Sequence, residues 1–358
     1  MSTVNSAPER QGERRATRGR GRLLAILANQ QMVLVVVLIV LVAFFWSRNH
    51  LFISSSEIGN LLTDFSGLAL LSVGEMYVIV SGGIDLSVGS TVAVSGILGA
   101  FVMQDMLNAH DPQVLVLLVG TAICALVGAT VGAINALMIT KAHLAPFVAT
   151  LVMLSAGAGL ALVFTGGAPV GLDSTAIIFS ASGVGPFSYP AIIIIVLVTI
   201  LGLYLHASRY GRYTFAIGSN SFAARAAGIN VQRHVASIYV LSGALAGLTG
   251  MFFYLRLGSG APTSGQDAEL TAIAAVVIGG SSLFGGSGRM SGTVLGAFVL
   301  TVVTDGLIFI NIQPTWNQVV VGAFIFFAAA LQALRLSSGS LARLLRPTSH
   351  AEEATDGR

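Results

Sequence analysis

The chain is a succession of apolar runs, most of them long enough to cross a membrane, joined by short polar segments. A transmembrane helix needs about 20 mostly apolar residues to cross roughly 30 Å of hydrocarbon. By that rule the sequence predicts about ten spans, with eight as the lower bound. The predicted spans are residues 28–46, 58–80, 87–104, 114–140, 145–165, 189–206, 235–256, 268–284, 291–311 and 316–334. Only 9% of the residues are charged, against about 25% in a typical soluble domain, so we predict an all-α, polytopic transmembrane bundle.

The distribution of Lys and Arg predicts an orientation for these spans. If the chain begins in the cytoplasm and the spans alternate, 16 of the 18 basic residues lie in cytoplasmic segments. Only Arg48 and Arg256 then lie outside. Because cytoplasmic loops carry an excess of Lys and Arg, we predict an even number of spans and two cytoplasmic termini.

Segments outside the spans divide the chain into an arm, a membrane domain and a tail. Residues 1–22 are polar and hold six arginines, and such an arm can anchor the topology or bind nucleic acid or anionic lipid. We interpret it as a cytoplasmic anchor and predict no nucleic-acid partner. Residues 23–336 form the predicted membrane domain, with an outer loop at 166–188 and a basic cytoplasmic loop at 207–234. Residues 337–358 form a predicted cytoplasmic tail.

One stretch of the sequence recurs 197 residues later. "GGIDLSVGS" from Gly82 matches "GGSSLFGGS" from Gly279, and "LGAFV" follows both without a gap, giving ten identities in 21 positions. Both copies close an inward span and open an outward one, as in a parallel repeat. Glycine pairs free backbone groups from the helix ladder. We therefore predict discontinuous helices near Gly82–Gly83 and Gly279–Gly280.

The polar residues beside these glycines have two interpretations. The first copy carries Asp85 and Ser87, and the second carries Ser281 and Ser282. Asp85 and Ser87 can cap the helix that follows them. Alternatively, these two residues, together with Ser282 and the glycine pairs, can line a solute path.

Carboxylates and an amide inside the predicted spans are a further set of candidates. The carboxylates are Asp64, Glu75, Glu269 and Asp305, and Glu75 and Asp305 fall near the middle of their predicted spans. Asn135 is the uncharged counterpart. A carboxylate at mid-span costs roughly 3 kcal/mol by insertion scales, so it faces the bundle interior or a cavity. Each group can serve transport or merely pack against hydroxyls and backbone carbonyls.

Small residues recur in "GATVGAIN" and "LSGALAGLTG". Small residues spaced four apart let transmembrane helices approach closely. We predict tight helix packing at these two stretches.

Motifs for covalent chemistry and for nucleotide binding are absent from the sequence. There is no GxxxxGK[ST] loop, since "GGSSLFGGSGRMSG" lacks the lysine. The six histidines are scattered, without an HExxH motif or a Cys–His cluster. We predict no catalytic residue, no metal site and no cofactor in this chain, so any transport is energised by another subunit or by an ion gradient.

The basic loop contains a short predicted helix in "SNSFAARAAGINV". Ser219, Asn220 or Ser221 can cap its start, and Gly228 can end it in the left-handed conformation. Phe222 is its apolar anchor. Such a helix can dock into a groove on another protein or lie at the membrane surface.

Four separated stretches together resemble one family. They are "VIVSGGIDLSVGS", "GAINALMITKAHLAPFVATLVML", "GRYTFAIGSNSFAARAAGINV" and "AELTAIAAVVIGGSSLFGGSGRMSGTVLGA". Over about residues 30–335 the chain resembles the membrane subunits of sugar ABC importers of the ribose, xylose and galactose kind. The resemblance implies a permease in the bacterial plasma membrane that works as a dimer, usually a homodimer of identical chains, in contact with lipid. It also implies an ATPase partner with two nucleotide-binding domains, which binds the ATP, and a periplasmic or lipid-anchored sugar-binding protein.

The resemblance also implies a coupling segment in the basic loop, because ABC importers carry a cytoplasmic loop of the form EAA-xxx-G-x9-I-x-LP. Phenylalanine replaces the glutamate here and the LP pair is missing. The residues at that spacing or within it are Phe222, Ala223, Ala224, Arg225, Gly228 and Ile238.

Two other functions remain open. An ABC permease of a nearby type carries nucleosides or branched-chain amino acids with the same architecture. A secondary carrier would use Glu75 or Asp305 for protons and would need no ATPase.

Overall fold

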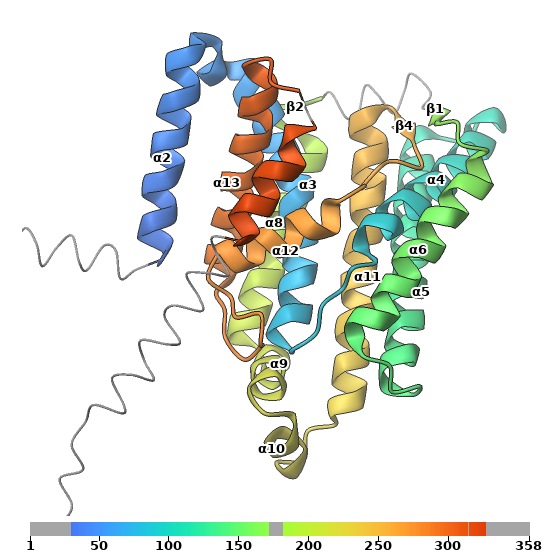
Figure 1. The fold of residues 1–358 in the computed structure, drawn as a ribbon. Coiled ribbons are helices and arrows are strands. Elements are labelled where there is room, and N and C mark those ends of the chain that lie inside the picture. The colour runs from blue at the N-terminus through green and yellow to red at the C-terminus, as the bar shows by residue number, and fades with distance from the viewer. Residues whose placement is uncertain (1–29, 172–181, 314, 327–358) are drawn as a thin grey trace, which may run out of the picture.

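The computed structural model describes residues 30–171, 182–313 and 315–326, which form a bundle of α-helices with little strand (Figure 1). Eight of the described helices are long and apolar enough to cross a membrane. They are α2 (Gln30–Arg48), α3 (Ser55–Val80), α4 (Val88–Asn108), α5 (Gln113–Thr140), α6 (Pro146–Thr165), α8 (Tyr189–Ala207), α11 (Val231–Leu257) and α13 (Met290–Phe309). The predicted polytopic helical bundle is therefore confirmed.

Two of the ten predicted spans correspond to shorter apolar helices. Helix α12 (Ala268–Ile278) covers the first 11 residues of the predicted span 268–284. Helix Trp316–Phe326 lies in the predicted span 316–334. The rest of that span, the predicted arm and the predicted tail lie outside the described residues. The described chain thus holds eight full-length spans, the lower bound of the predicted number.

Short elements connect the spans. The connecting helices are η1 (His50–Ile53), α9 (Arg209–Ser219) and α10 (Ser221–Ala226). The strands are β1 (Val170–Gly171), β2 (Gly183–Val184), β3 (Phe187–Ser188) and β4 (Ser259–Gly260). β1 pairs antiparallel with β4, and β2 pairs antiparallel with β3 to form a hairpin.

Helices α3 and α11 form the centre of the bundle. Most of both helices is buried, whereas only a small part of α2, α5 and α6 is buried. The largest buried apolar cluster includes Tyr77 and Ile79 on α3, and Ile238 and Tyr239 on α11. Because α3 also contacts α8, α12 and α13, it joins the early and late parts of the chain.

Helices α5 and α11 approach each other along small residues. A Cβ atom added to Gly128 would meet the backbone of Gly243, and one added to Gly132 would meet the backbone of Tyr239. Any side chain at these glycines would push the two helices apart. The close packing predicted from "GATVGAIN" and "LSGALAGLTG" is confirmed.

Both predicted glycine pairs lie where a helix ends. Gly82 has φ +89° and Gly280 has φ +94°, in the left-handed region that residues with a Cβ rarely adopt. The N–H of Gly83 donates to the carbonyl of Val78 at 3.0 Å, and the N–H of Ser281 donates to the carbonyl of Val276 at 3.2 Å. This is the Schellman arrangement. Gly82 is therefore the structural counterpart of Gly280, whereas the ungapped sequence match pairs it with Gly279.

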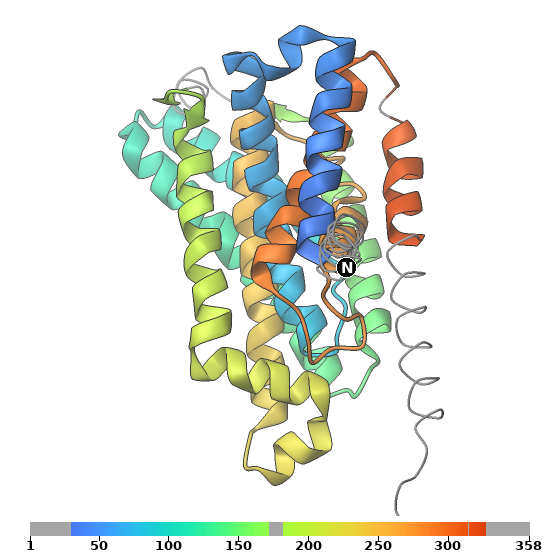
Figure 2. The same cartoon turned by 90° about the vertical axis from the view of Figure 1, so that its left-hand side faces the viewer.

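The two ends of the bundle differ in charge. The basic end carries α9, α10 and the segments 141–145 and 282–289, and Figure 2 shows α9 lying across it. The hairpin end carries η1 and both strand pairs (Figure 1). The described basic residues at the basic end are Lys141, Arg209, Arg212, Arg225, Arg233 and Arg289. Arg48 and Arg256 lie in the last turns of helices that end at the hairpin end. The basic residues are thus separated as the positive-inside rule predicts.

Candidate functional site

Between α3 and α4 the chain runs back into the bundle (Figure 1). Residues 81–87 make this return, and Asp85 is fully buried. Buried backbone groups need hydrogen-bond partners, and side chains supply them here. The N–H of Asp85 donates to Oε1 of Glu75 at 3.2 Å, and the carbonyl of Ile84 accepts from the Tyr239 hydroxyl at 3.4 Å. These polar groups let irregular backbone lie inside an apolar bundle.

The carboxylate of Asp85 joins several elements. Its Oδ1 accepts from the Ser87 N–H at 3.0 Å and from the Ser87 hydroxyl at 2.6 Å, and its Oδ2 accepts from the Ser242 hydroxyl on α11 at 3.0 Å. Asn135 on α5 donates from Nδ2 to the Ser87 hydroxyl at 2.7 Å. We call the five residues Glu75, Asp85, Ser87, Asn135 and Ser242 the Asp85 cluster. The cluster ties the start of α4 to α3, α5 and α11.

The contacts of the Asp85 cluster can be compared with the two predicted roles of Asp85 and Ser87, which are to cap α4 or to line a solute path. Oδ1 of Asp85 accepts the N–H of Ser87, the residue before α4, so Asp85 closes a local turn and bonds no N–H inside the helix. The Ser87 side chain makes no capping bond to α4. Oε2 of Glu75 and Oδ1 of Asn135 are buried and have no hydrogen-bond partner among the described residues. Neither Asp85 nor Ser87 thus makes the predicted side-chain cap of α4, and a lining role for Asp85, Ser87 and Asn135 stays a prediction.

Glu75 and Asp305 do not lie at mid-span, so this sequence prediction was wrong. Helix α3 ends at Val80, as the predicted span does, so Glu75 lies five residues from the end of both. Asp305 lies four residues before the end of α13. Glu75 belongs to the Asp85 cluster, whereas Asp305 lines a cavity of about 340 Å³ with Asp64 on α3. The two carboxylates occupy separate sites, because α3 and α13 run in opposite directions between the two ends (Figure 1).

The second glycine segment, residues 279–289, lies at the basic end (Figure 1). The N–H of Gly286 donates to the carbonyl of Val80 at 2.9 Å. A Cβ atom added to Gly285 would meet the backbone of Gly82 at 2.9 Å. The two glycine segments therefore touch each other where α3 ends.

Two residues of this segment have structural surroundings that the repeat did not predict. The Ser282 hydroxyl accepts the N–H of Phe284 at 3.2 Å, so it stabilises a local turn. Gly279 packs against the backbone of Gly292, which brings α12 close to α13. These contacts do not test whether Gly279, Gly280 or Ser282 lines a solute path, so that role stays a prediction.

Helix α10 has the predicted form of a docking helix. The Asn220 side chain caps its start by accepting the N–H of Ala223 at 3.0 Å. Gly228 follows its end with φ +85°. Phe222 is 83% exposed while Ala224 is 4% exposed. One face of α10 therefore packs on the protein and the other presents an aromatic ring.

The remaining motif residues divide between surface and core. Arg225 is exposed on α10, whereas Ile238 is fully buried on α11. The predicted basic loop 207–234 in fact contains α9, α10 and the first turn of α11. Helix α9 was missed because its apolar residues are few and its length is only 11 residues.

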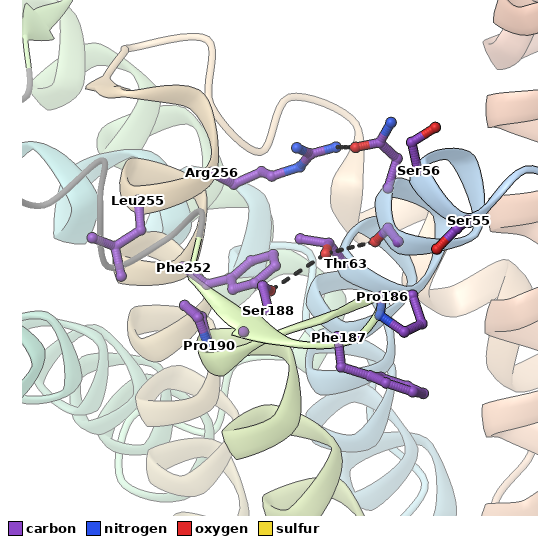
Figure 3. Close-up of a pocket in the computed structure, with 14 residues that line it drawn as sticks. Ser55, Ser56, Thr63, Pro186, Phe187, Ser188, Pro190, Phe252, Leu255 and Arg256 are labelled. Carbon is purple, nitrogen blue, oxygen red and sulfur yellow. Dashed lines mark hydrogen bonds between the residues drawn. The ribbon is translucent and has the colours of Figure 1, made fainter.

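The hairpin end contains a cavity of about 640 Å³ (Figure 3). It lies between the start of α3, the β2–β3 hairpin, the start of α8 and the end of α11. Figure 3 shows Thr63 and Ser188 joined by a hydrogen bond, with Phe252 beside them and Arg256 across the cavity from them. The cavity combines hydroxyl, amide and guanidinium groups with an aromatic ring.

An ion pair beside this cavity was not predicted. Arg256 donates from Nε to Oδ1 of Asp64 at 2.9 Å and from Nη2 to Oδ2 at 3.0 Å. Both side chains are about one-third exposed. A signal for it exists in the sequence, because Asp64 and Arg256 fall near the same end of neighbouring spans.

The sequence matches the family described as "branched-chain amino acid transport system / permease component" over residues 57–329. It is 37% identical over 301 residues to the ribose import permease protein of Escherichia coli strain K12, covering 83% of this chain and 91% of that protein. It is 34% identical over 316 residues to the galactose/methyl galactoside import permease protein of the same strain, covering 84% and 93%. It is 33% identical over 300 residues to the D-allose transport system permease protein of that strain, covering 83% and 90%.

Proposed function

The chain belongs to this family of ABC-importer permeases, and we propose that it forms the translocation path for a monosaccharide or related polyol. The observation that carries the proposal is the similarity to import permeases for ribose, for galactose and methyl galactoside, and for D-allose. Each similarity extends over more than four-fifths of the chain. The chain itself catalyses no reaction and moves its solute by changing conformation.

The energy comes from a separate ATPase. The sequence contains no nucleotide-binding loop, so ATP binds to a partner subunit with two nucleotide-binding domains. That partner docks on α10, because Phe222 stands out from the protein beside the exposed Arg225. An exposed aromatic residue next to a cation is a feature of protein interfaces. The basic end is then the cytoplasmic end, in agreement with the positive-inside rule.

Contacts lead from α10 towards the Asp85 cluster. Helix α9 is bonded to α11 twice: the hydroxyls of Tyr210 and Ser237 are 2.9 Å apart, and Thr214 Oγ1 is 2.9 Å from Nε2 of His234. Farther along α11, Tyr239 donates to the backbone beside Asp85. Movement of α10 and α9 by the ATPase would therefore shift α11 against residues 81–87.

The hairpin end faces the periplasm or cell exterior, and it receives sugar from a periplasmic or lipid-anchored binding protein. The exposed apolar faces of α2, α5, α6 and α8 suit contact with lipid and with a second copy of the chain. Alternating access of the two ends would carry the solute inward. A neutral polyol needs hydrogen-bonding groups and no unpaired charge, and the hydroxyls and amides that line the hairpin-end cavity meet that need.

The substrate class is tested by uptake into vesicles that contain the permease, its ATPase and its binding protein. We expect ATP-dependent uptake of labelled ribose, galactose or allose that excess unlabelled sugar suppresses and L-leucine does not. The family description makes branched-chain amino acids the second candidate. Uptake of leucine or of a nucleoside in preference to every sugar would replace the proposal with that alternative.

A further inference from the structure

The hairpin-end cavity has the dimensions of a small-molecule site. Its volume is about 640 Å³, within the range of about 300–1,000 Å³ that ligand pockets occupy. Residues from α3, the β2–β3 hairpin, α8 and α11 converge on it. Three parts of the chain that are distant in sequence therefore line one partly open cavity: the start of α3, the hairpin with the start of α8, and the end of α11 (Figure 3).

Several polar groups of the cavity make long hydrogen bonds with one another. The hydroxyls of Thr63 and Ser188 are 3.4 Å apart, and Asn60 Oδ1 is 3.5 Å from Nη2 of Arg256. Typical protein hydrogen bonds are about 2.7–3.0 Å long, and they weaken steeply with distance. These groups therefore hold each other loosely and can exchange these bonds for bonds to a solute. Thr63 can do so only as an acceptor, because its hydroxyl already donates to the carbonyl of Gly59 at 2.8 Å.

The charge in the cavity is already compensated. Two bonds of 2.9 and 3.0 Å hold Arg256 against Asp64. A guanidinium has five N–H donors, and Nη1 is not used in the bonds to Asp64 or Asn60. Arg256 can therefore donate hydrogen bonds without presenting an unpaired positive charge. Such a site suits a neutral solute better than an anion.

The ring of Phe252 gives the cavity a rigid apolar wall. It is 3% exposed and packs against Gly67 on α3, where a Cβ atom would lie 2.8 Å from the ring. The ring also contacts Phe253, with 6.1 Å between the centroids. A sugar presents both hydroxyl groups and an apolar C–H face, so it matches a cavity with polar groups on one side and a fixed ring on another.

We propose that the hairpin-end cavity is a monosaccharide-binding site of the permease itself, in which Asn60, Thr63, Ser188 and Arg256 bond the hydroxyls and an edge of the Phe252 ring forms part of the apolar wall. This site rests on the proposed function and gives it a place in the path: the solute pauses here after leaving the binding protein. Asp64 is a positioning residue, since it fixes Arg256.

The test is protection of a cysteine placed in the cavity. Ser55 lines the cavity and is exposed, and the chain's single cysteine, Cys124, is buried. The Ser55→Cys variant, in the assembled importer in vesicles, is labelled by an impermeant maleimide with and without ribose, galactose or allose. Val184→Cys is the matched control, because Val184 is 65% exposed on the same hairpin end and lies outside the cavity.

We expect millimolar monosaccharide to slow labelling of Ser55→Cys several-fold and to leave Val184→Cys unchanged. Thr63→Val should weaken that protection about three- to tenfold, the effect of losing one hydrogen bond. Thr130→Val is its control: each threonine donates to the carbonyl four residues earlier at 2.8 Å, but Thr130 is exposed on α5.

Two results would overturn the site. Labelling of Ser55→Cys that no sugar slows, in vesicles that import a monosaccharide, removes the site and leaves the proposed function intact. Protection by L-leucine and not by sugars refutes a neutral-polyol site. Failure of the wild-type importer to take up any monosaccharide, while leucine is imported, contradicts the proposed function separately.

Discussion

Segments 81–87 and 279–289 follow helices that end at a left-handed glycine with the same hydrogen-bond pattern, yet they occupy different places. The first runs back into the bundle, and its Asp85 is fully buried. The second is four residues longer and remains at the basic end, where Phe284 is 78% exposed. Matched sequence thus produces matched helix ends and unmatched loops.

The difference lies in which polar side chains each segment can use. Asp85 accepts three hydrogen bonds, from Ser87 and Ser242, so the first segment can satisfy its polar groups without water. The second segment has serines in place of Ile84 and Asp85, and Ser282 bonds only to its own turn. Most residues of this segment are at least partly exposed, so backbone groups without a protein partner can bond to water.

The largest expected effect comes from removing the acceptor that buries the first segment. Asp85→Leu leaves three donors unpaired, and each unpaired buried group costs about 1–3 kcal/mol, so we expect a loss of at least ~3 kcal/mol. Ser282→Ala, the control in the second segment, should cost less than ~1 kcal/mol. Unfolding of the purified permease in detergent measures both. Equal losses would contradict the distinction between the segments.

Substitutions that disturb packing should lower stability by less. For these substitutions we expect the larger loss in the second segment and the smaller loss in the first. Gly279→Val places atoms against the backbone of Gly292, and overpacking of this kind costs about 1–3 kcal/mol. Gly82→Ala meets only the Gly218 Cα atom at 3.9 Å, so only the strain of the left-handed conformation remains, about 1–2 kcal/mol. We therefore expect Gly279→Val to lower the free energy of unfolding by more than Gly82→Ala does, with a loss near the upper end of its range. The opposite order would show that conformation outweighs contact here.

Coupling within the first segment should be detectable by a double-mutant cycle. Ser242→Ala removes one donor to Asp85 and should cost about 1 kcal/mol in the wild-type background. In the Asp85→Leu background the same change should cost nearly nothing, because the bond is already lost. Full additivity of the two losses would show that the Ser242 bond contributes no stability.

The smallest stability effects are expected at the two exposed phenylalanines of the basic end. Phe222→Ser on α10 and Phe284→Ser in the second segment should each change stability by less than ~0.5 kcal/mol, as surface substitutions do. Their effects on function should differ: Phe222→Ser should reduce sugar uptake per ATP hydrolysed several-fold. Uptake and hydrolysis measured together give the ratio, and an equal reduction in Phe284→Ser would move the docking surface away from α10.

The sequence was sufficient for the features that follow from local chemistry. Apolar runs predicted the bundle, and glycine pairs predicted the ends of α3 and α12. Gly228 predicted the end of α10, and its cap Asn220 is one of the three residues predicted for that role. Small residues predicted the contact between α5 and α11. Each of these depends on a few neighbouring residues and on general rules for helices.

Features that depend on long-range packing were not predictable. Asp64 and Arg256 are 192 residues apart in sequence, so their pairing emerges only when α3 and α11 lie side by side. The burial of residues 81–87 likewise depends on Ser242 and Asn135, which come from other helices.

The source of energy is tested most directly by solute accumulation in vesicles, with and without the partner ATPase. We expect vesicles that contain the complete importer, with the ATPase inside and the binding protein outside, to concentrate a monosaccharide only when ATP is hydrolysed. Vesicles with this chain alone should not do so under a proton gradient. Uphill uptake by the lone chain, abolished in Glu75→Gln or Asp305→Asn, would contradict an ATP-driven permease and establish a proton-coupled carrier.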